Sequence, residues 1–326
     1  MPKVMDMLRS WGISLDLALE AREIVRGETG EEIPGVRVDR ESYPHAEVTI
    51  VHIVEKAAES IMGKPVGTYI TIEAPVLREN VPHAHHEVSQ VLARMLGRYI
   101  SPLPREAVIL LVGLGNWRAT PDALGPKVVE LSLVTRHLFQ YAPHELKEGM
   151  RVVCALAPGV LGLTGIETAE IIRGVVEKTA PSLIIAVDSL AARSVTRICT
   201  TIQIADTGIN PGSGIGNRRA AINRETMGVP VLAIGVPTVV HAAVIGQDTI
   251  STYLELVKAA INPSLNYHLA RQAVEKVLAP FGGNLTVTPK EIDTLIVRMA
   301  KVIAGAINLA LHPALTADDY SYYLEH

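Results

Sequence analysis

The sequence predicts an α/β fold in which a mainly parallel or mixed central sheet is covered by helices on both faces. Short apolar runs of strand length recur along the chain, and helical segments of ten or more residues separate them. The composition agrees with this, because 48% of the 326 residues are hydrophobic and only 20% are charged. A chain of this kind can bury a large core and is not disordered.

The individual elements can be followed along the chain by their periodicity. The predicted strands are Glu47–Val54, Gly67–Glu73, Ala107–Val112, Arg151–Ala157, Leu183–Val187, Thr200–Ala205 and Val231–Val236. Apolar residues at helical spacing predict helices at His86–Tyr99, Lys127–Leu138 and Gly165–Thr179. The segment Gly27–Asp39 contains glycines, Pro34 and acidic residues, which predicts a flexible connection. The motif Thr288-Pro289-Lys290-Glu291 is typical of a helix start, so we expect a helical C-terminal part.

Charge, cysteine content and the length of apolar runs exclude several classes of protein. Thirty basic and thirty-four acidic residues give a net charge of -4, which offers no general attraction to nucleic acid or anionic membrane. Two cysteines, Cys154 and Cys199, are too few for a disulfide framework. The apolar run Val297–Leu311 contains Arg298 and Lys301 and is too short to span a bilayer. We therefore expect a cytoplasmic protein with no nucleic-acid partner and no membrane partner.

Polar sequence follows three of the predicted strands. One strand leads through Gly113-Leu114-Gly115-Asn116 to Asp122, a second ends in Asp188, and a third is followed by His241. Ligands and catalytic groups in open α/β sheets lie beyond the carboxyl ends of the strands. If these strands are neighbours, Asp122 and Asp188 converge on one crevice.

Two converging carboxyl groups are suited to the hydrolysis of a peptide bond. Close placement disfavours double ionisation, so one acid keeps its proton while the other stays charged. The charged acid can take a proton from water, and the protonated acid can polarise a carbonyl or protonate a leaving nitrogen. Alternatively, Asp122 and Asp188 bind a metal with His241 as a third ligand. A purely structural interpretation also stands, in which Asp122 caps a helix and Asp188 holds a turn.

Several ordered motifs resemble the germination protease family of spore-forming bacteria. They include Gly113–Asn116 with Thr120–Lys127, Val187–Arg193 and Asn210–Asn217, and the resemblance runs from about Leu15 to Leu311. The resemblance implies a fold similar to that of the hydrogenase-maturation proteases. It also implies an atypical aspartic endopeptidase without a cofactor, in which the catalytic residues are Asp122 and Asp188.

The resemblance further implies a biological setting. Family members degrade small acid-soluble spore proteins during germination, form homotetramers and are made as self-processing zymogens, so we expect these properties here, in the spore core. The family's propeptide is removed at an acidic residue, followed by a large apolar residue and Ala-x-Glu. The segment Asp16-Leu17-Ala18-Leu19-Glu20 matches this site.

The match predicts cleavage between Asp16 and Leu17. Residues 1–16 are then the propeptide, and residues 17–326 form a single α/β protease domain with a helical C-terminal part. The same residues also fit a helix start with Asp16 as its N-cap. A non-catalytic peptide-binding relative with the same fold remains an alternative function.

Other motifs carry weaker signals. Asp206-Thr207-Gly208 spells the signature of all-β aspartic proteases, but in an alternating α/β chain it predicts a turn at the end of a strand. The segment Gly212–Asn217 lacks the Lys-Ser/Thr of a phosphate-binding loop and predicts a tight loop near the substrate cleft. The histidine-rich segment His83–Glu87 could ligate a metal, although a solvated loop that enters a helix is the simpler interpretation.

Overall fold

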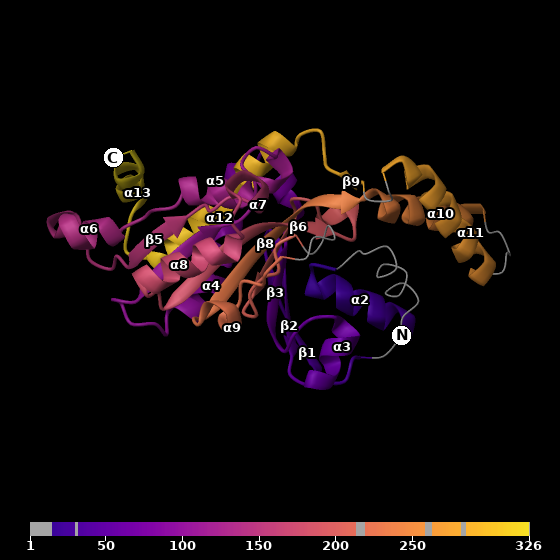
Figure 1. The fold of residues 1–326 in the computed structure, drawn as a ribbon, viewed down its shortest axis with the longest axis horizontal. Helices are drawn as coiled ribbons and strands as arrows, with labels where there is room; N and C mark the ends of the chain where they lie inside the picture. The colour runs from indigo at the N-terminus through magenta and orange to yellow at the C-terminus, as the bar shows by residue number, and fades with distance from the viewer. Residues whose placement is uncertain (1–14, 30–31, 213–218, 258–262, 282–284, 326) are drawn as a thin grey trace.

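A nine-stranded mixed sheet runs through the protein in a computed structural model that describes residues 15–29, 32–212, 219–257, 263–281 and 285–325 (Figure 1). The strands are β1 (Val36–Tyr43), β2 (Ala46–Ile53), β3 (Gly67–Glu73), β4 (Val108–Gly113), β5 (Val152–Leu156), β6 (Leu183–Ala192), β7 (Thr201–Ala205), β8 (Val231–His241) and β9 (Thr286–Val287). Their order across the sheet is β1-β2-β3-β7-β8-β6-β4-β5, and β9 pairs with β8. The α/β fold with a mixed central sheet, predicted from the sequence, is therefore confirmed.

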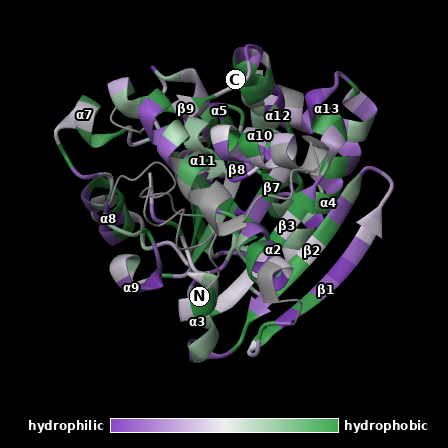
Figure 2. Cartoon of the chain, turned by 90° about the vertical axis from the view of Figure 1, so that its right-hand side faces the viewer, coloured by the Kyte–Doolittle hydropathy of each residue, from purple (hydrophilic) through white to green (hydrophobic). Residues whose placement is uncertain are grey.

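The sheet has a parallel half and an antiparallel half that meet at β8. Strands β8, β6, β4 and β5 are parallel to one another, whereas β1, β2, β3, β7 and β8 pair in antiparallel fashion. The outermost antiparallel strand, β1, carries mostly hydrophilic side chains (Figure 2). Charged residues on an edge strand discourage pairing with other chains.

Helices cover both faces of this sheet (Figure 1). The longer ones are α2 (Ala18–Thr29), α4 (Pro82–Ile100), α8 (Thr168–Thr179), α10 (Ala242–Val257), α11 (Pro263–Leu278) and α12 (Ile292–Leu311). The shorter ones are α3 (Lys56–Met62), α5 (Leu124–Glu130), α6 (Arg136–Tyr141), α7 (Leu161–Thr164), α9 (Arg224–Met227) and α13 (Ala317–Glu325).

Alternation along β6 shows which face each side chain meets. Ile185 and Val187 belong to the main core with α4, α5 and α12, whereas Ile184 and Ala186 belong to a second core with α8 and α9. Successive residues of a strand point to opposite faces. Asp188 therefore lies on the same face as Ala186. It lies within β6, which continues to Ala192 instead of ending at Val187 as the sequence predicts.

Helix α12 is apolar because it is a core helix. Among the residues that the structure describes, it alone is long and apolar enough to cross a membrane, but 61% of its most apolar window is buried. It packs against α4 and α5, and the Ser89 hydroxyl of α4 donates a 2.9 Å hydrogen bond to the carbonyl of Val302.

Three other local expectations from the sequence are wrong. Residues 36–39 of the supposed flexible connection belong to β1, whose alternation of charged and apolar residues marks an edge strand. The helix predicted at Lys127–Leu138 is two helices, α5 and α6, separated at residues 131–135. Helix α12 begins only at Ile292, with Glu291 and not Thr288 at its N-cap, and the Thr288 hydroxyl donates to the carbonyl of Thr238.

Candidate active site

Asp188 is a buried carboxyl group on β6, in the parallel half of the sheet and next to β8, where the two halves meet. It pairs with Gly235 of β8, and only 4% of its surface is exposed. The backbone N–H of Ser189 donates a 2.8 Å hydrogen bond to its Oδ1. Asp188 thus projects from a strand held on both sides by parallel neighbours.

Asp122 ends a short 3-10 turn, Thr120–Asp122, that follows β4. The backbone N–H of Asn116 donates to both the Oδ2 atom and the carbonyl oxygen of Asp122, at 2.9 and 3.0 Å. Gly115 adopts a φ of +114°, and a Cβ atom there would lie 2.0 Å from the carbonyl oxygen of Asp122. A Cβ atom on Gly125 would lie 2.6 Å from the carbonyl oxygen of Val187. The two glycines let this turn press against β6 beside Asp188.

The structure brings Asp122 and Asp188 together along one cavity of about 520 Å³. Burial raises the pKa of Asp122 to about 6, although the hydrogen bond from Asn116 opposes the shift. Burial raises the pKa of Asp188 well above its usual range, and the nearby carboxyl groups of Asp122 and Asp16 raise it further. Burial and the neighbouring carboxyl groups therefore favour the protonated form of Asp188, whereas Asp122, with a pKa of about 6, is largely charged at neutral pH.

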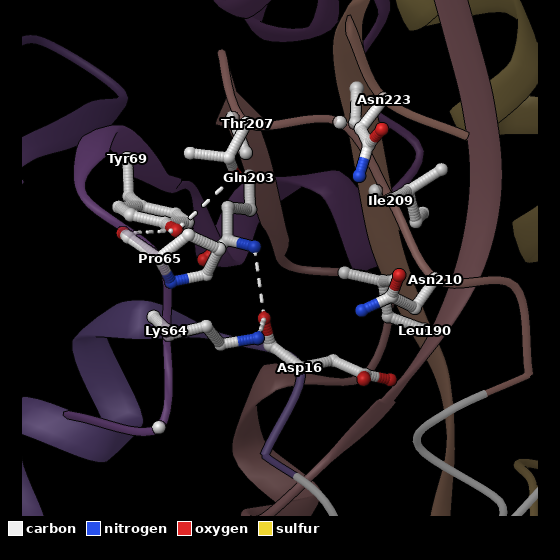
Figure 3. Close-up of a pocket in the computed structure, with 15 residues that line it drawn as sticks. Asp16, Lys64, Pro65, Tyr69, Leu190, Gln203, Thr207, Ile209, Asn210 and Asn223 are labelled. Carbon is white, nitrogen blue, oxygen red and sulfur yellow. Dashed lines mark hydrogen bonds between the residues drawn. The ribbon is translucent and has the colours of Figure 1, made fainter. Parts of the chain in front are cut away.

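Asp16 lines the same cavity and joins it to a smaller one of about 140 Å³ (Figure 3). Its Oδ2 atom accepts a 3.0 Å hydrogen bond from the backbone N–H of Ala191 on β6. Its carbonyl oxygen accepts hydrogen bonds from Lys64 Nζ at 2.9 Å and from Gln203 Nε2 at 3.0 Å. The carbonyl of the bond between Asp16 and Leu17 is therefore fixed by two hydrogen bonds, in a residue that lines the cavity of the two acids, and helix α2 begins only at Ala18.

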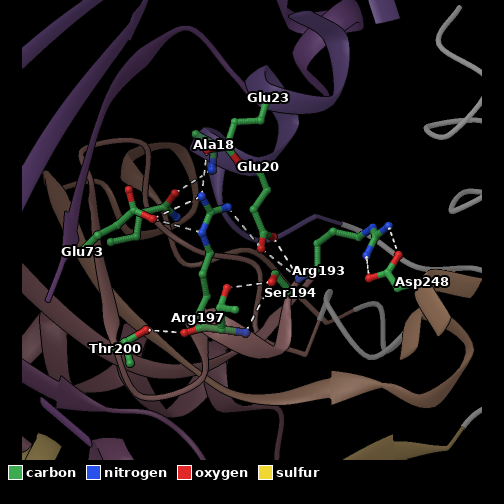
Figure 4. A network of polar contacts seen from close by, with 11 residues as sticks. Ala18, Glu20, Glu23, Glu73, Arg193, Ser194, Arg197, Thr200 and Asp248 are labelled. Atoms are coloured by element: carbon green, nitrogen blue, oxygen red, sulfur yellow. Dashed lines mark hydrogen bonds and ion pairs between the residues drawn. The ribbon is translucent and has the colours of Figure 1, made fainter. Parts of the chain in front are cut away.

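The rest of the segment Asp16–Glu20 is also buried against the body of the protein. Leu17 and Ala18 are fully buried, and the N–H of Ala18 donates a 2.7 Å hydrogen bond to Gln203 Oε1. Glu20 accepts hydrogen bonds of 3.0 Å from the backbone N–H of Arg193 (Figure 4). Arg197 Nη1 lies 3.4 Å from Glu20, and Arg197 Nη2 pairs with Glu23 of the same helix and with Glu73 of β3.

His241 does not join the two acids. It lies on β8 six residues beyond Gly235, the partner of Asp188, and six residues of strand span about 20 Å. Within the described part of the chain, the His, Cys, Asp and Glu residues that could hold a metal form one group: His45, His83 and Glu87. The geometry therefore gives no support to a metal held by Asp122, Asp188 and His241.

The group at His45 lies elsewhere in the molecule. His83 Nε2 is 3.3 Å from Glu87 Oε1, and His45 Nε2 is 3.6 Å from Glu87 Oε2. Two of these residues come from the histidine-rich segment noted in the sequence, whereas His45 comes from the turn between β1 and β2. None of the three lines the cavity that holds Asp122.

The remaining sequence candidates have structural roles or lie partly outside the described residues. Asp206 follows β7 directly, and its Oδ1 accepts a 2.8 Å hydrogen bond from the N–H of Thr68, so the predicted turn is confirmed. Gly212 lines the acid cavity, but residues 213–217 of that loop are not among those described. Cys154 is half-buried within β5. Burial raises the pKa of Cys199 to about 12, which keeps this thiol protonated.

Sequence reasoning misses Lys64 and Gln203. Lys64 lies in the turn after α3, a position with no motif around it. Gln203 does offer a signal, because it is a lone amide in the apolar run Thr201–Ala205 of a buried strand. A buried side-chain amide needs hydrogen-bond partners. Here the nitrogen and the oxygen of the Gln203 amide each form a hydrogen bond with the backbone, one on either side of Leu17.

Comparison with known proteins gives a consistent result. The family model described as germination protease matches residues 15–262 and 259–324. A germination protease of Caldanaerobacter subterraneus subsp. tengcongensis is 49% identical over 322 residues, which cover 96% of this chain and 98% of that protein. Those of Clostridium tetani and Bacillus velezensis are each 44% identical, over 96% and 95% of this chain and 99% and 96% of their own lengths.

Proposed function

Because this chain belongs to the germination protease family and is a peptidase, we propose that Asp122 and Asp188 are the catalytic pair of its peptidase reaction. The observation that carries this proposal is the shared cavity: it places Asp122, Asp188 and Asp16 along one surface. Two acids with unequal burial, next to a peptide segment, form an arrangement suited to aspartic-type hydrolysis.

The difference in burial assigns the two roles. Asp122, charged near neutral pH, takes a proton from a water molecule whose oxygen adds to the carbonyl carbon of the peptide bond. Asp188 gives its proton to the leaving nitrogen as the carbon–nitrogen bond breaks. The products are a new carboxyl group and a new amine, and transfer of the proton from Asp122 back to Asp188 restores the pair. The two groups titrate as a unit because each influences the other.

The docked segment supports self-processing at the bond between Asp16 and Leu17. Asp16 lines the cavity of the two acids while it is still joined to Leu17, and its carbonyl oxygen is already hydrogen bonded. We propose that the protein is a zymogen and that residues 1–16 are its propeptide. Residues 1–14 lie outside the described residues.

The family membership supports the choice of substrate. We propose that the mature enzyme is an endopeptidase that degrades small acid-soluble spore proteins during germination in the spore core. Such substrates would carry the same order of acidic, large apolar, Ala-x-Glu residues and would occupy the positions that residues 16–20 occupy here. The homotetramer implied by the resemblance is part of the same proposal, and light scattering tests it.

The experiment compares single substitutions of the two acids. Asp122→Asn and Asp188→Asn are each expected to slow cleavage of a small acid-soluble spore protein by at least about 100-fold, the scale of general acid–base catalysis. Asp206→Asn is the matched control, because it lies outside the acid cavity and keeps an acceptor for Thr68. Circular dichroism checks that each variant is folded. Full activity in Asp122→Asn or Asp188→Asn would remove that residue from the mechanism.

A further inference from the structure

Two polar side chains from different elements meet at one carbonyl oxygen. Lys64 Nζ and Gln203 Nε2 both donate to the carbonyl oxygen of Asp16, at 2.9 and 3.0 Å (Figure 3). Gln203 belongs to the buried strand β7 and is only 7% exposed, whereas Lys64 reaches the oxygen from the turn after α3. Two donors fixed in place from separate elements are the arrangement that stabilises negative charge on an oxygen.

The sheet places this oxygen near the catalytic pair. Gln203 of β7 pairs with Gly235 of β8, which in turn pairs with Asp188 of β6. Asp16 spans β8, since its carbonyl bonds Gln203 on β7 and its carboxylate bonds Ala191 on β6, three residues beyond Asp188. Gly235 lacks a side chain and lines the small cavity that Asp16 also lines. The carbonyl of Asp16 is thus approached by the two donors from the β7 side, and the two acids lie on the β6 side.

Gln203 also fixes the direction of the bound chain. Its Oε1 atom accepts from the N–H of Ala18 while its Nε2 atom donates to the carbonyl of Asp16. In an extended chain, the carbonyl of Asp16 and the N–H of Ala18, which flank Leu17, point to the same side. The side-chain amide of Gln203 can therefore bond both groups. This contact positions Leu17 and with it the peptide bond before it.

We propose that Lys64 and Gln203 are further catalytic residues, the oxyanion hole of this peptidase. The inference rests on the proposed cleavage between Asp16 and Leu17. When water adds to the carbonyl carbon, the electron pair of the C=O double bond moves onto the oxygen. Lys64 and Gln203 hold this negative charge until the bond to the Leu17 nitrogen breaks and the carbonyl re-forms. The same donors receive the corresponding carbonyl of a spore-protein substrate after the propeptide has left.

The test measures self-processing of the full chain in four variants. The variants are Lys64→Met, Gln203→Glu, the conservative Lys64→Arg and a control, Lys56→Met, at the exposed start of α3. Gln203→Glu keeps an acceptor for the N–H of Ala18 but loses the donor to Asp16. The rate constant is followed by the mass of the processed chain, and hydrogen exchange of residues 15–25 reports whether the segment stays docked.

Lys64→Met and Gln203→Glu are each expected to slow processing by about 100-fold or more while the segment stays protected, since one lost oxyanion donor costs 10²–10³ in rate. Lys64→Arg keeps a charged donor, so its rate constant of self-processing is expected to be about tenfold higher than that of Lys64→Met. Lys56→Met is expected to match the unmodified chain.

Two outcomes overturn the inference. One is a rate constant of self-processing in Lys64→Met and Gln203→Glu that lies within about threefold of that of the unmodified chain, much less than the expected loss of about 100-fold. The other is slow processing accompanied by loss of protection, which would make these residues a structural clamp. An Asp188→Asn arm separates the two proposals. Normal processing in that arm overturns the catalytic pair, whereas inactivity there together with normal Lys64→Met and Gln203→Glu overturns the oxyanion hole alone.

Discussion

Asp188 and Gln203 project from the same face of the sheet at the same level, with Gly235 of β8 between them. Paired residues of neighbouring strands share a face, so the parallel half of the sheet supplies the acid and the antiparallel half supplies the amide. The Asp16 backbone and carboxylate connect the two halves across β8. The junction between the two halves is therefore the place where a bound peptide can reach both groups.

The two acids predict an acid limit to activity. Burial raises the pKa of Asp122 to about 6, and its charged form is the proposed base. As the pH falls through about 6, Asp122 gains a proton, so kcat/KM is expected to fall about tenfold per pH unit below that value. At high pH the loss of the proton on Asp188 is expected to give a second, alkaline limit, because burial and the carboxyl groups of Asp122 and Asp16 raise its pKa well above the usual range.

The measurement is the pH profile of kcat/KM on a peptide with the sequence of residues 13–24. Circular dichroism at pH 5 serves as the control that the fold persists where activity is low. A profile that stays flat down to pH 4 would contradict the assignment of Asp122 as the base.

The buried segment predicts the new N-terminus after self-processing. Ala18 and Ala21 of α2 are fully buried, and α2 packs against α3, β2 and β3. We therefore expect the mature chain to begin at Leu17 and to retain residues 17–29 in its folded body. N-terminal sequencing and intact mass after processing check both statements. A different first residue would move the cleavage site.

Part of this site can be predicted from the sequence and part cannot. The sequence places Asp122 after one apolar strand and Asp188 at the end of another, and parallel strands gather functional groups at their carboxyl ends, so it predicts that the two acids converge if these strands are neighbours. In the structure Asp188 lies within β6, which continues to Ala192. Lys64 and Gln203 belong to the antiparallel half, where no comparable rule applies. Their contact with Asp16 depends on side chains from positions 48 and 187 residues away in the sequence.

The fold shows the same division between local and long-range information. Apolar strands such as β4 and β6 are visible as continuous runs because both their faces are buried. Edge strand β1 escapes prediction because its exposed, charged positions resemble a connection. The local motif at Thr288 predicts the start of α12 too early, and the contact that Thr288 does make is with Thr238, fifty residues earlier in the chain.

Glu20 predicts that docking of the N-terminal segment depends on pH. Burial raises the pKa of Glu20 from 4.5 to about 7, although Arg197 and the backbone N–H of Arg193 act in the opposite direction. The docked state then binds more protons than the undocked state between these two values. Docking is fully stabilised below about pH 4.5 and weakens as the pH rises towards about 7.

Hydrogen exchange of residues 15–25 at pH 5.5 and pH 8, corrected for the intrinsic exchange rate, measures this change. Asp188→Asn is the background for the experiment, so that the chain stays uncleaved. Lys64 also lies within electrostatic range of Glu20, and burial lowers its pKa, so Lys64→Met is measured in parallel. Glu20→Gln is expected to reduce the pH dependence, and an equal dependence in this variant would assign it to another group.

The close contact at Gly115 predicts that even its replacement by alanine lowers both stability and activity. A Cβ atom at this position would lie 2.0 Å from the carbonyl oxygen of Asp122, and the φ of +114° is unfavourable for any residue with a side chain. Gly115→Ala is expected to lower the free energy of unfolding by about 2 kcal/mol or more, through overpacking and backbone strain together. It also displaces Asp122 from Asp188, so cleavage is expected to fall with it.

Gly174→Ala is the matched control, because this helical glycine of α8 has no neighbour within 4 Å of a Cβ atom. In urea unfolding, the change in the free energy of unfolding should have opposite signs in the two variants, since alanine stabilises a helix interior by about 1 kcal/mol relative to glycine. Equal stability of Gly115→Ala and the unmodified chain would show that the turn before Asp122 is not held by this contact.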